Sequence, residues 1–363
     1  MAVTSALTQA SPAPAPALGG WVLSARFDLF FFVGSSLSVV LAWLASEVLA
    51  MPALYVIGAV AVLSNGPHLA STWTRVYLDA RERRERPIHY FVAPLIVVGA
   101  VAALLFIDGA SSALIRSVLF YWAFWHFVAQ CWGLLRIYQR KAGDVGKPVA
   151  HLERAVLWAV ALAPFIERLH SGPWALFGSE IYHPDVPRSL VLATWGLAGL
   201  LSFAYMIVHI VRVARHELAP GLTGWIRPLF LGATALAFYV PFTRIKSNGA
   251  TAFAAAACWH GLQYIGIVWF YNRNRYKSGL DARARLVSWV SQPGREIWYF
   301  VTLLAVVGVF YAGIVVAGQF VLEPARIGSF VWLSLTFTHY YLDGVIWKLR
   351  RPELAKNLGA APA

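Results

Sequence analysis

Long apolar runs, separated by short segments rich in arginine and lysine, recur along the whole chain. A helix needs about 20 apolar residues to cross a hydrocarbon core of roughly 30 Å. The fifth run is interrupted by Pro164 and Glu167, and the short seventh contains Pro241, so either could be kinked or re-entrant. We predict an all-α polytopic membrane bundle of about ten helices arranged as five hairpins. The predicted spans lie near 27–49, 53–77, 90–108, 113–137, 155–169, 189–211, 227–243, 250–271, 297–321 and 328–347.

The basic residues indicate how this bundle is oriented. With the N-terminus in the cytoplasm, 24 of the 30 Lys and Arg residues fall on the cytoplasmic side and 6 on the other. Cytoplasmic loops of membrane proteins retain such an excess, so both termini are expected inside, in a bacterial inner membrane. We expect one transmembrane domain over 25–350. A disordered Ala- and Pro-rich cytoplasmic tail is expected at 1–24, and a short cytoplasmic tail at 351–363.

Composition agrees with a membrane protein and excludes several functions. The chain is 59% hydrophobic and 13% charged, outside the range of soluble domains. Its net charge of +13 comes from clusters between apolar runs, where lipid headgroups and topology explain it, so no nucleic-acid partner is expected. Cys131 and Cys258 lie in apolar runs and are expected to be small buried residues. The sequence contains no Rossmann or Walker pattern for a soluble nucleotide.

Four predicted spans that run toward the cytoplasm each carry one histidine at a similar depth. Each histidine precedes the first basic residue of its cytoplasmic end by 7 to 13 positions, which places it roughly 10 to 20 Å below the charged layer. Polar groups in the hydrocarbon region turn toward the bundle interior, and neutral imidazole is the commonest ligand for iron, copper and zinc. We predict a metal site formed by His68, His126, His260 and His339.

A hydrogen-bonding side chain follows each of these histidines by three or four positions and therefore shares its helix face. Asp343 is predicted to be a ligand or a proton acceptor, because a carboxylate added to histidines suits iron in oxygen chemistry. Gln130 and Gln263 are predicted as catalytic-site residues. Metal-bound histidines need hydrogen-bond acceptors that fix the orientation of their rings. Candidates for this role are Gln130, Gln263, Thr72 and Asn65. His209 and Asp28 are lesser candidates for the same site.

These features favour a membrane-embedded, iron-dependent oxidoreductase or oxygenase of lipid metabolism. Aromatic residues around the histidines could form a wall for a hydrophobic lipid or isoprenoid substrate. Electrons would come from a separate donor attracted by the basic cytoplasmic loops. The arrangement is functionally analogous to integral-membrane non-haem iron enzymes. Because the HxxxH and HxxHH clusters of desaturases and alkane hydroxylases are absent, the sequence indicates no particular family.

Three other functions use the same histidines. A haem-binding electron-transfer protein needs two axial histidines, fewer than the four found here. A metal or proton transporter needs polar groups across the whole membrane, but the opposite helix halves, such as VIGAVAVL and AFAAAAC, are apolar. A scaffold would use the histidines only for hydrogen bonds between helices.

Overall fold

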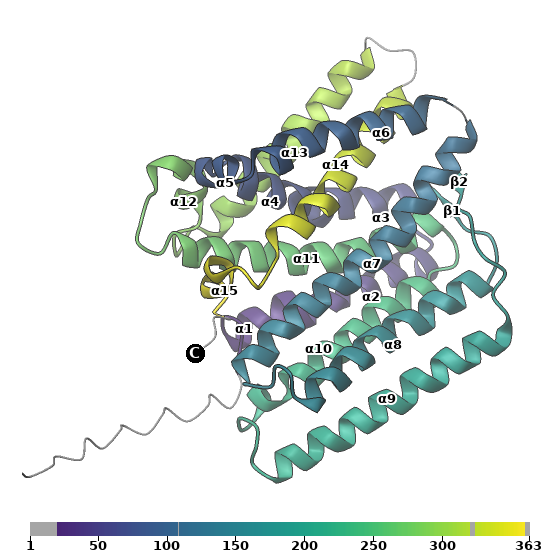
Figure 1. The fold of residues 1–363 in the computed structure, drawn as a ribbon. Coiled ribbons are helices and arrows are strands. Elements are labelled where there is room, and N and C mark those ends of the chain that lie inside the picture. The colour runs from purple at the N-terminus through teal and green to yellow at the C-terminus, as the bar shows by residue number, and fades with distance from the viewer. Residues whose placement is uncertain (1–19, 108, 320–323, 360–363) are drawn as a thin grey trace, which may run out of the picture.

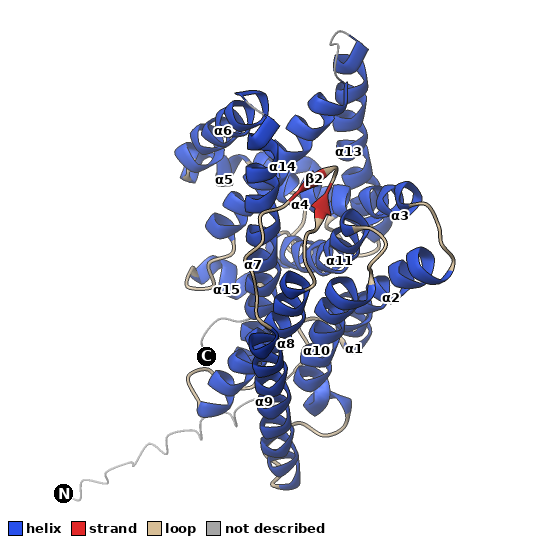
Figure 2. Ribbon diagram, turned by 90° about the vertical axis from the view of Figure 1, so that its right-hand side faces the viewer, coloured by secondary structure: helices blue, strands red, loops and turns tan. Residues whose placement is uncertain are grey.

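The computed structural model describes residues 20–107, 109–319 and 324–359, and nearly all of its regular structure is helical (Figures 1 and 2). Within those residues, nine helices are long and apolar enough to cross a membrane. The tenth predicted span corresponds to α14 (Pro324–Ile346), which has 23 residues but carries threonine, histidine and aspartate near its end. The prediction of an all-α polytopic bundle is confirmed. The predicted N-terminal tail lies largely outside the described residues, whereas the C-terminal tail is described to residue 359 and contains a short helix over Pro352–Asn357.

Several spans combine α-helix with short π-helical or 3-10 turns, written here as η. The first three spans comprise α1 (Ala25–Asp28), η1 (Leu29–Val33), η2 (Gly34–Ser36), α2 (Leu37–Trp43) and η3 (Leu44–Val48); α3 (Ala53–Val60), η4 (Ala61–Asn65) and α4 (Gly66–Tyr77); and η5 (Ile88–Val92) and α6 (Ala93–Ile107). The remaining elements that cross the bundle are α7 (Gly109–Lys141), α8 (Pro148–His170), α9 (Arg188–Ala214), α10 (Leu222–Tyr239) with η6 (Val240–Arg244), α11 (Gly249–Arg275), α13 (Glu296–Gln319) and α14. Short connecting elements are α5 (Ala80–Glu85), β1 (Ala175–Leu176), β2 (Ser179–Glu180), η7 (Ala282–Ala284), α12 (Arg285–Val290) and α15 (Pro352–Asn357).

Helix α11 is the centre of the bundle (Figure 1). It packs against α2, α3 and α4, and 89% of its most apolar window is buried. Its run AFAAAAC at 252–258 allows this, because small side chains let neighbouring backbones approach closely. Helix α9 is an outer helix that packs against α8 and leaves Leu200, Phe203 and Ile210 exposed, as a lipid-facing surface requires.

The two weakest predicted spans are both continuous helices rather than re-entrant segments. Helix α8 continues through Pro164. The seventh span widens from α10 into the π turn η6, which contains Pro241. Another π turn, η4, comes directly before Pro67 in the second span. Proline interrupts the regular helical hydrogen-bond pattern and clashes with the preceding turn, and a π turn absorbs that local misfit.

A buried charge cluster holds the basic ends of four helices together. The carboxylate of Asp144, between α7 and α8, accepts hydrogen bonds from Arg212 of α9 and Arg227 of α10 at 2.8 to 3.1 Å. Arg227 also pairs with Glu153 of α8 at 2.9 Å. Burial alone would raise the pKa of Asp144, but the hydrogen bonds and positive charges of the arginines and Lys147 outweigh it, so its pKa is lowered. The ionised carboxylate is therefore part of the folded state.

Replacing Asp144 with asparagine should lower the free energy of unfolding in detergent by about 3 kcal/mol, because it leaves buried guanidinium groups without their counter-ion. Since the folded pKa lies below the ordinary value of 3.8, this stabilisation is present above that value and is lost as the pH falls through the folded pKa. Wild type and Asp144→Asn should therefore converge in acid. Unfolding of both proteins in sodium dodecyl sulfate at several pH values measures this difference in the free energy of unfolding. The exposed control Asp185→Asn should be unchanged, and an equal loss in both variants would contradict the assignment.

Candidate metal centre

The four predicted histidines meet at one place in the bundle interior. His68 comes from α4, His126 from α7, His260 from α11 and His339 from α14. One ring nitrogen from each lies within 4.8 Å of the others, and none of the four residues is more than 5% exposed. The structure therefore brings together residues from four separate spans into a group that could hold a metal ion.

Most of the ring nitrogens in this group have no hydrogen-bond partner. Within the described part of the chain, both nitrogens of His68, both of His260, and the Nε2 atoms of His126 and His339 are buried without one. A buried polar atom without a partner costs roughly 1 to 3 kcal/mol. Two nitrogens on opposite sides of one ion lie about 4.2 Å apart at a metal–nitrogen distance of about 2.1 Å. The four candidate ligand atoms lie within 4.8 Å of one another, close to that separation, so the group could hold a metal ion.

Asp343 lies beside the histidines and is held by hydroxyl groups. Its Oδ1 atom accepts a 2.6 Å hydrogen bond from Tyr264, and its Oδ2 atom is 3.7 Å from Nε2 of His126. Thr72 contacts the Tyr264 hydroxyl at 2.6 Å and Nδ1 of His339 at 2.7 Å. Trp347 donates to the Tyr264 oxygen at 3.1 Å. A single connected set of hydrogen bonds therefore joins the carboxylate to one of the histidine rings.

This set of hydrogen bonds indicates which ring nitrogen of His339 carries the proton. A carboxylate only accepts, so the Tyr264 hydroxyl donates its one hydrogen to Asp343. The Thr72 hydroxyl then donates to Tyr264 or Asp343 and has only an acceptor left for His339. With Asp343 ionised, Nδ1 of His339 therefore carries the proton, and Nε2 is left with a free lone pair that can bind a metal.

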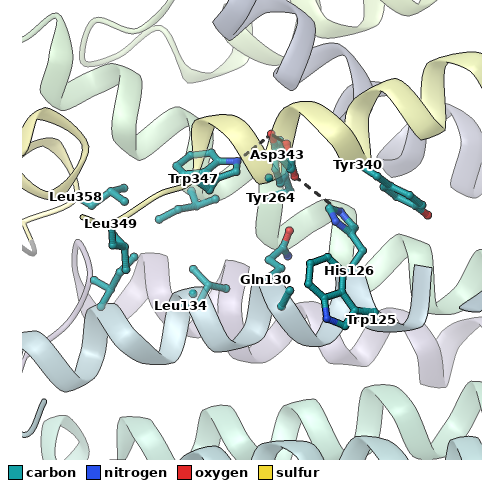
Figure 3. A pocket seen from close by; sticks show the side chains of 15 residues that line it. Trp125, His126, Gln130, Leu134, Tyr264, Tyr340, Asp343, Trp347, Leu349 and Leu358 are labelled. Atoms are coloured by element: carbon teal, nitrogen blue, oxygen red, sulfur yellow. Dashed lines mark hydrogen bonds and ion pairs between the residues drawn. The ribbon is translucent and has the colours of Figure 1, made fainter. Parts of the chain in front are cut away.

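An apolar cavity of about 210 Å³ opens beside Asp343 and His126, between α7 and α14 (Figure 3). In Figure 3 these two side chains point toward one another, while Leu349 and Leu358 lie at the far end of the cavity. We call it the inner cavity. The residues that line it are Trp125, His126, Ala129, Gln130, Gly133, Leu134, Ile137, Tyr264, Ile267, Tyr340, Asp343, Gly344, Trp347, Leu349 and Leu358.

Gln130 and Gln263 lie near the histidine rings but form no hydrogen bond with them. The Gln130 amide donates to the backbone oxygen of His260 at 3.0 Å and to Oε1 of Gln263 at 3.2 Å. Gln263 in turn donates to the backbone oxygen of Phe32. These amides join α7, α11 and η1. Thr72 alone among the four predicted ring-orienting residues contacts a histidine ring of the group; Asn65 lines a small void beside His68 and His260.

His209 and Asp28 do not belong to the group of four. The His209 ring packs against Trp225 with ring centroids 4.6 Å apart, on the outer helix α9. Asp28 accepts hydrogen bonds from the backbone of Val22 and from the hydroxyl of Tyr138. The side chains of His209 and Asp28 therefore lie outside the histidine group.

Tyr264 and Trp347 contact the site but were not predicted as site residues. Their spacing contains the available signal, because Tyr264 follows His260 by four positions and Trp347 follows Asp343 by four. Each therefore shares a helix face with a predicted site residue. The number of aromatic residues nearby made this spacing difficult to distinguish from ordinary packing.

Gly261 permits the close approach of α11 to the second span. A Cβ atom at this position would lie 2.5 Å from Oγ of Ser64 and 3.2 Å from Cβ of His68. The Ser64 hydroxyl is itself hydrogen-bonded to the backbone oxygen of Cys258 at 2.8 Å, so it is not free to move away. Glycine next to His260 is thus needed for His68 and His260 to lie side by side.

Gly261→Ala should separate these two helices and disturb the histidine group. We expect a loss of stability of about 1 to 3 kcal/mol, as overpacking of a close contact produces, together with weaker metal retention. The matched control is Gly232→Ala in α10, where an added Cβ atom meets nothing within 4 Å. Metal analysis and thermal unfolding of both purified variants measure the two effects. Equal behaviour of the two variants would contradict the proposed packing constraint.

Comparisons of the chain with protein-family models, curated proteins and solved structures find no match. The chemistry of the site is therefore argued from its geometry.

Proposed function

We propose that this protein is a membrane-embedded, metal-dependent oxidoreductase or oxygenase that acts on a hydrophobic lipid or isoprenoid. The observation that carries this proposal is the group of four buried imidazoles whose candidate ligand atoms lie within 4.8 Å of one another. Purely structural histidines would be expected to pair with acceptors, yet most of these nitrogens have no partner among the described residues. A metal ion would provide a partner for one nitrogen of each of the four rings.

Iron is the metal we propose. Imidazole also suits copper and zinc, but the nearby carboxylate of Asp343 adds the oxygen donor typical of non-haem iron sites. When bound, iron would supply oxygen activation. His68, His126, His260 and His339 would hold the ion, with His339 fixed through Thr72. Asp343 would act as an additional ligand or as the acceptor of a proton at its Oδ2 atom, which faces His126.

The inner cavity supports the proposed class of substrate. Its walls between α7 and α14 are mainly apolar or aromatic, and its polar groups gather at the end near the histidines. Oε1 of Gln130 has no partner among the described residues and could accept a hydrogen bond from a substrate hydroxyl. Gln263 would act by positioning Gln130. The surrounding apolar side chains would exclude water from the reacting groups.

The geometry gives less support to the two alternative functions. A haem iron already has four equatorial nitrogens from its porphyrin, so it could use only two of the four converging histidines. A cation transporter would need a path to the opposite face, where the guanidinium of Arg116 lines the next cavity and repels cations.

Metal analysis of purified protein tests the proposed centre. Wild type reconstituted with iron should hold close to one equivalent by mass spectrometry, and His126→Ala should lose most of it. The matched control is His209→Ala, which removes a buried histidine outside the group and should retain iron. Well-folded wild type that binds no iron, or equal loss in both variants, would contradict the proposal.

Filling the inner cavity tests the proposed substrate class. An added Cβ atom at Gly133 meets nothing within 4 Å and points into free space, so Gly133→Phe should fold and keep its iron while excluding an apolar chain. Solvent extraction and mass spectrometry should find apolar molecules co-purified with wild type and with Gly133→Ala. The phenylalanine variant should contain fewer of them. An unchanged lipid content would contradict the assignment of the cavity.

We further propose that the protein lies in a bacterial inner membrane with both termini in the cytoplasm, where an electron donor would dock on the basic loops. The described chain begins and ends beside Lys141: its Nζ atom donates to the backbone of Val22 at 3.1 Å and lies near Gly359. A green fluorescent protein fused after the C-terminus should therefore fluoresce. Alkaline phosphatase is active only in the periplasm, so activity of a phosphatase fused at the same junction would contradict this orientation.

A further inference from the structure

A second cavity, of about 250 Å³, lies on the other side of the histidine group from the inner cavity. It is formed by α3, η4, α11, α13 and α14, at the end of the bundle where the β1–β2 hairpin is found (Figure 2). We call it the outer cavity. Its walls are mostly apolar or aromatic, and no acidic residue lines it in the described part of the chain. The lining residues used below are Asn65, Arg116, Phe177, Phe253, Ala254 and Trp332.

Arg116 of α7 lines this cavity without a partner for its charge. The side chain is 7% exposed, and its Nε donor is buried with no hydrogen bond. Among the described residues no carboxylate pairs with it, and the ring of Phe177 lies 6.0 Å from the guanidinium carbon. An unpaired cation inside a membrane bundle is costly. The planar guanidinium presents paired donors that match a carboxylate or phosphate group.

The hairpin places an aromatic ring over the same cavity at a conformational cost. Phe177 has a φ of 50°, in the left-handed region, and Gly178 follows with a φ of 85°. Two such residues form the tight turn that usually contains Asn-Gly, and a bulky residue there is strained. The Phe177 ring contacts Trp332 and Phe253, with centroids 4.9 and 6.3 Å apart. The strained turn thus places the Phe177 ring as an apolar wall beside Arg116.

The outer cavity also borders the histidine group. A small void of about 10 Å³ is lined by His68 and His260, and it shares Asn65, Phe253 and Trp332 with the outer cavity. A molecule in the outer cavity would therefore have its apolar part close to two of the four histidines.

We propose that the outer cavity binds an amphiphile with an oxyanion head, a carboxylate or a phosphate, which Arg116 holds while the apolar chain packs against α11 and α14. This site is separate from the inner cavity and does not depend on a bound metal. The oxyanion supplies the counter-charge that the protein itself lacks around Arg116. The aromatic and aliphatic walls supply the contacts for the chain.

A fluorescent fatty acid tests this site directly. Purified protein in a non-ionic detergent should bind cis-parinaric acid at least tenfold more tightly than its methyl ester, since only the acid offers a charge-assisted hydrogen bond. Arg116→Gln should remove this preference and leave ester binding unchanged. The exposed Arg188→Gln, at the start of α9, should bind both probes as wild type does. Competition by dodecanoic acid and by dodecyl phosphate identifies the preferred head group.

Two further variants keep the proposal testable if Arg116→Gln does not fold. Ala254→Phe fills the outer cavity and should remove the preference for the acid over the ester while iron content is retained. Gly133→Phe fills only the inner cavity and should leave acid binding unchanged. Equal affinity of wild type for acid and ester, or an undiminished preference for the acid in Ala254→Phe, would overturn the proposal.

Discussion

The structure depends on one constraint, the cost of leaving imidazole nitrogens without partners inside an apolar bundle. Four helices converge so that one nitrogen from each ring lies within 4.8 Å of the others, where a single ion could bind all four rings. The convergence needs small residues on the central helix α11, above all Gly261, which allows His68 to lie against His260. The π turn η4, placed directly before Pro67, belongs to the same segment. The close packing around α11 therefore also determines how near the histidines lie to one another.

The surroundings of the four histidines differ on the two sides. On the basic side of the bundle, Asp343, Tyr264 and Thr72 form a connected set of hydrogen bonds at the end of the inner cavity. On the opposite side, the described residues that line the outer cavity include a cation, Arg116, and no acid. An acidic residue thus lines the inner cavity and a basic residue lines the outer cavity. Two molecules of different polarity could approach the same centre from opposite ends, one near Asp343 and the other held by Arg116.

The sequence was sufficient to predict the spans, because the length of an apolar run and the position of basic residues are local properties. It also indicated the four histidines, since their depth follows from counting residues to each basic end. It could not show which helices are neighbours. His209 lies on a span that runs in the same direction, yet α9 is an outer helix and holds it against Trp225. Gln130 and Gln263 share faces with histidines, but Gln130 donates to Gln263 and both amides donate to the backbone. Tyr264 and Trp347 enter the site only through contacts between helices.

The most direct test of the account is X-ray absorption spectroscopy at the iron edge of the reconstituted protein. The account predicts nitrogen or oxygen neighbours at about 2.0 to 2.2 Å, together with the outer-shell scattering of several imidazole rings. Removal of His126 should reduce that imidazole contribution, and removal of His209 should not. A spectrum with only solvent-like oxygen neighbours, or with no imidazole scattering, would show that the four histidines do not form a metal centre.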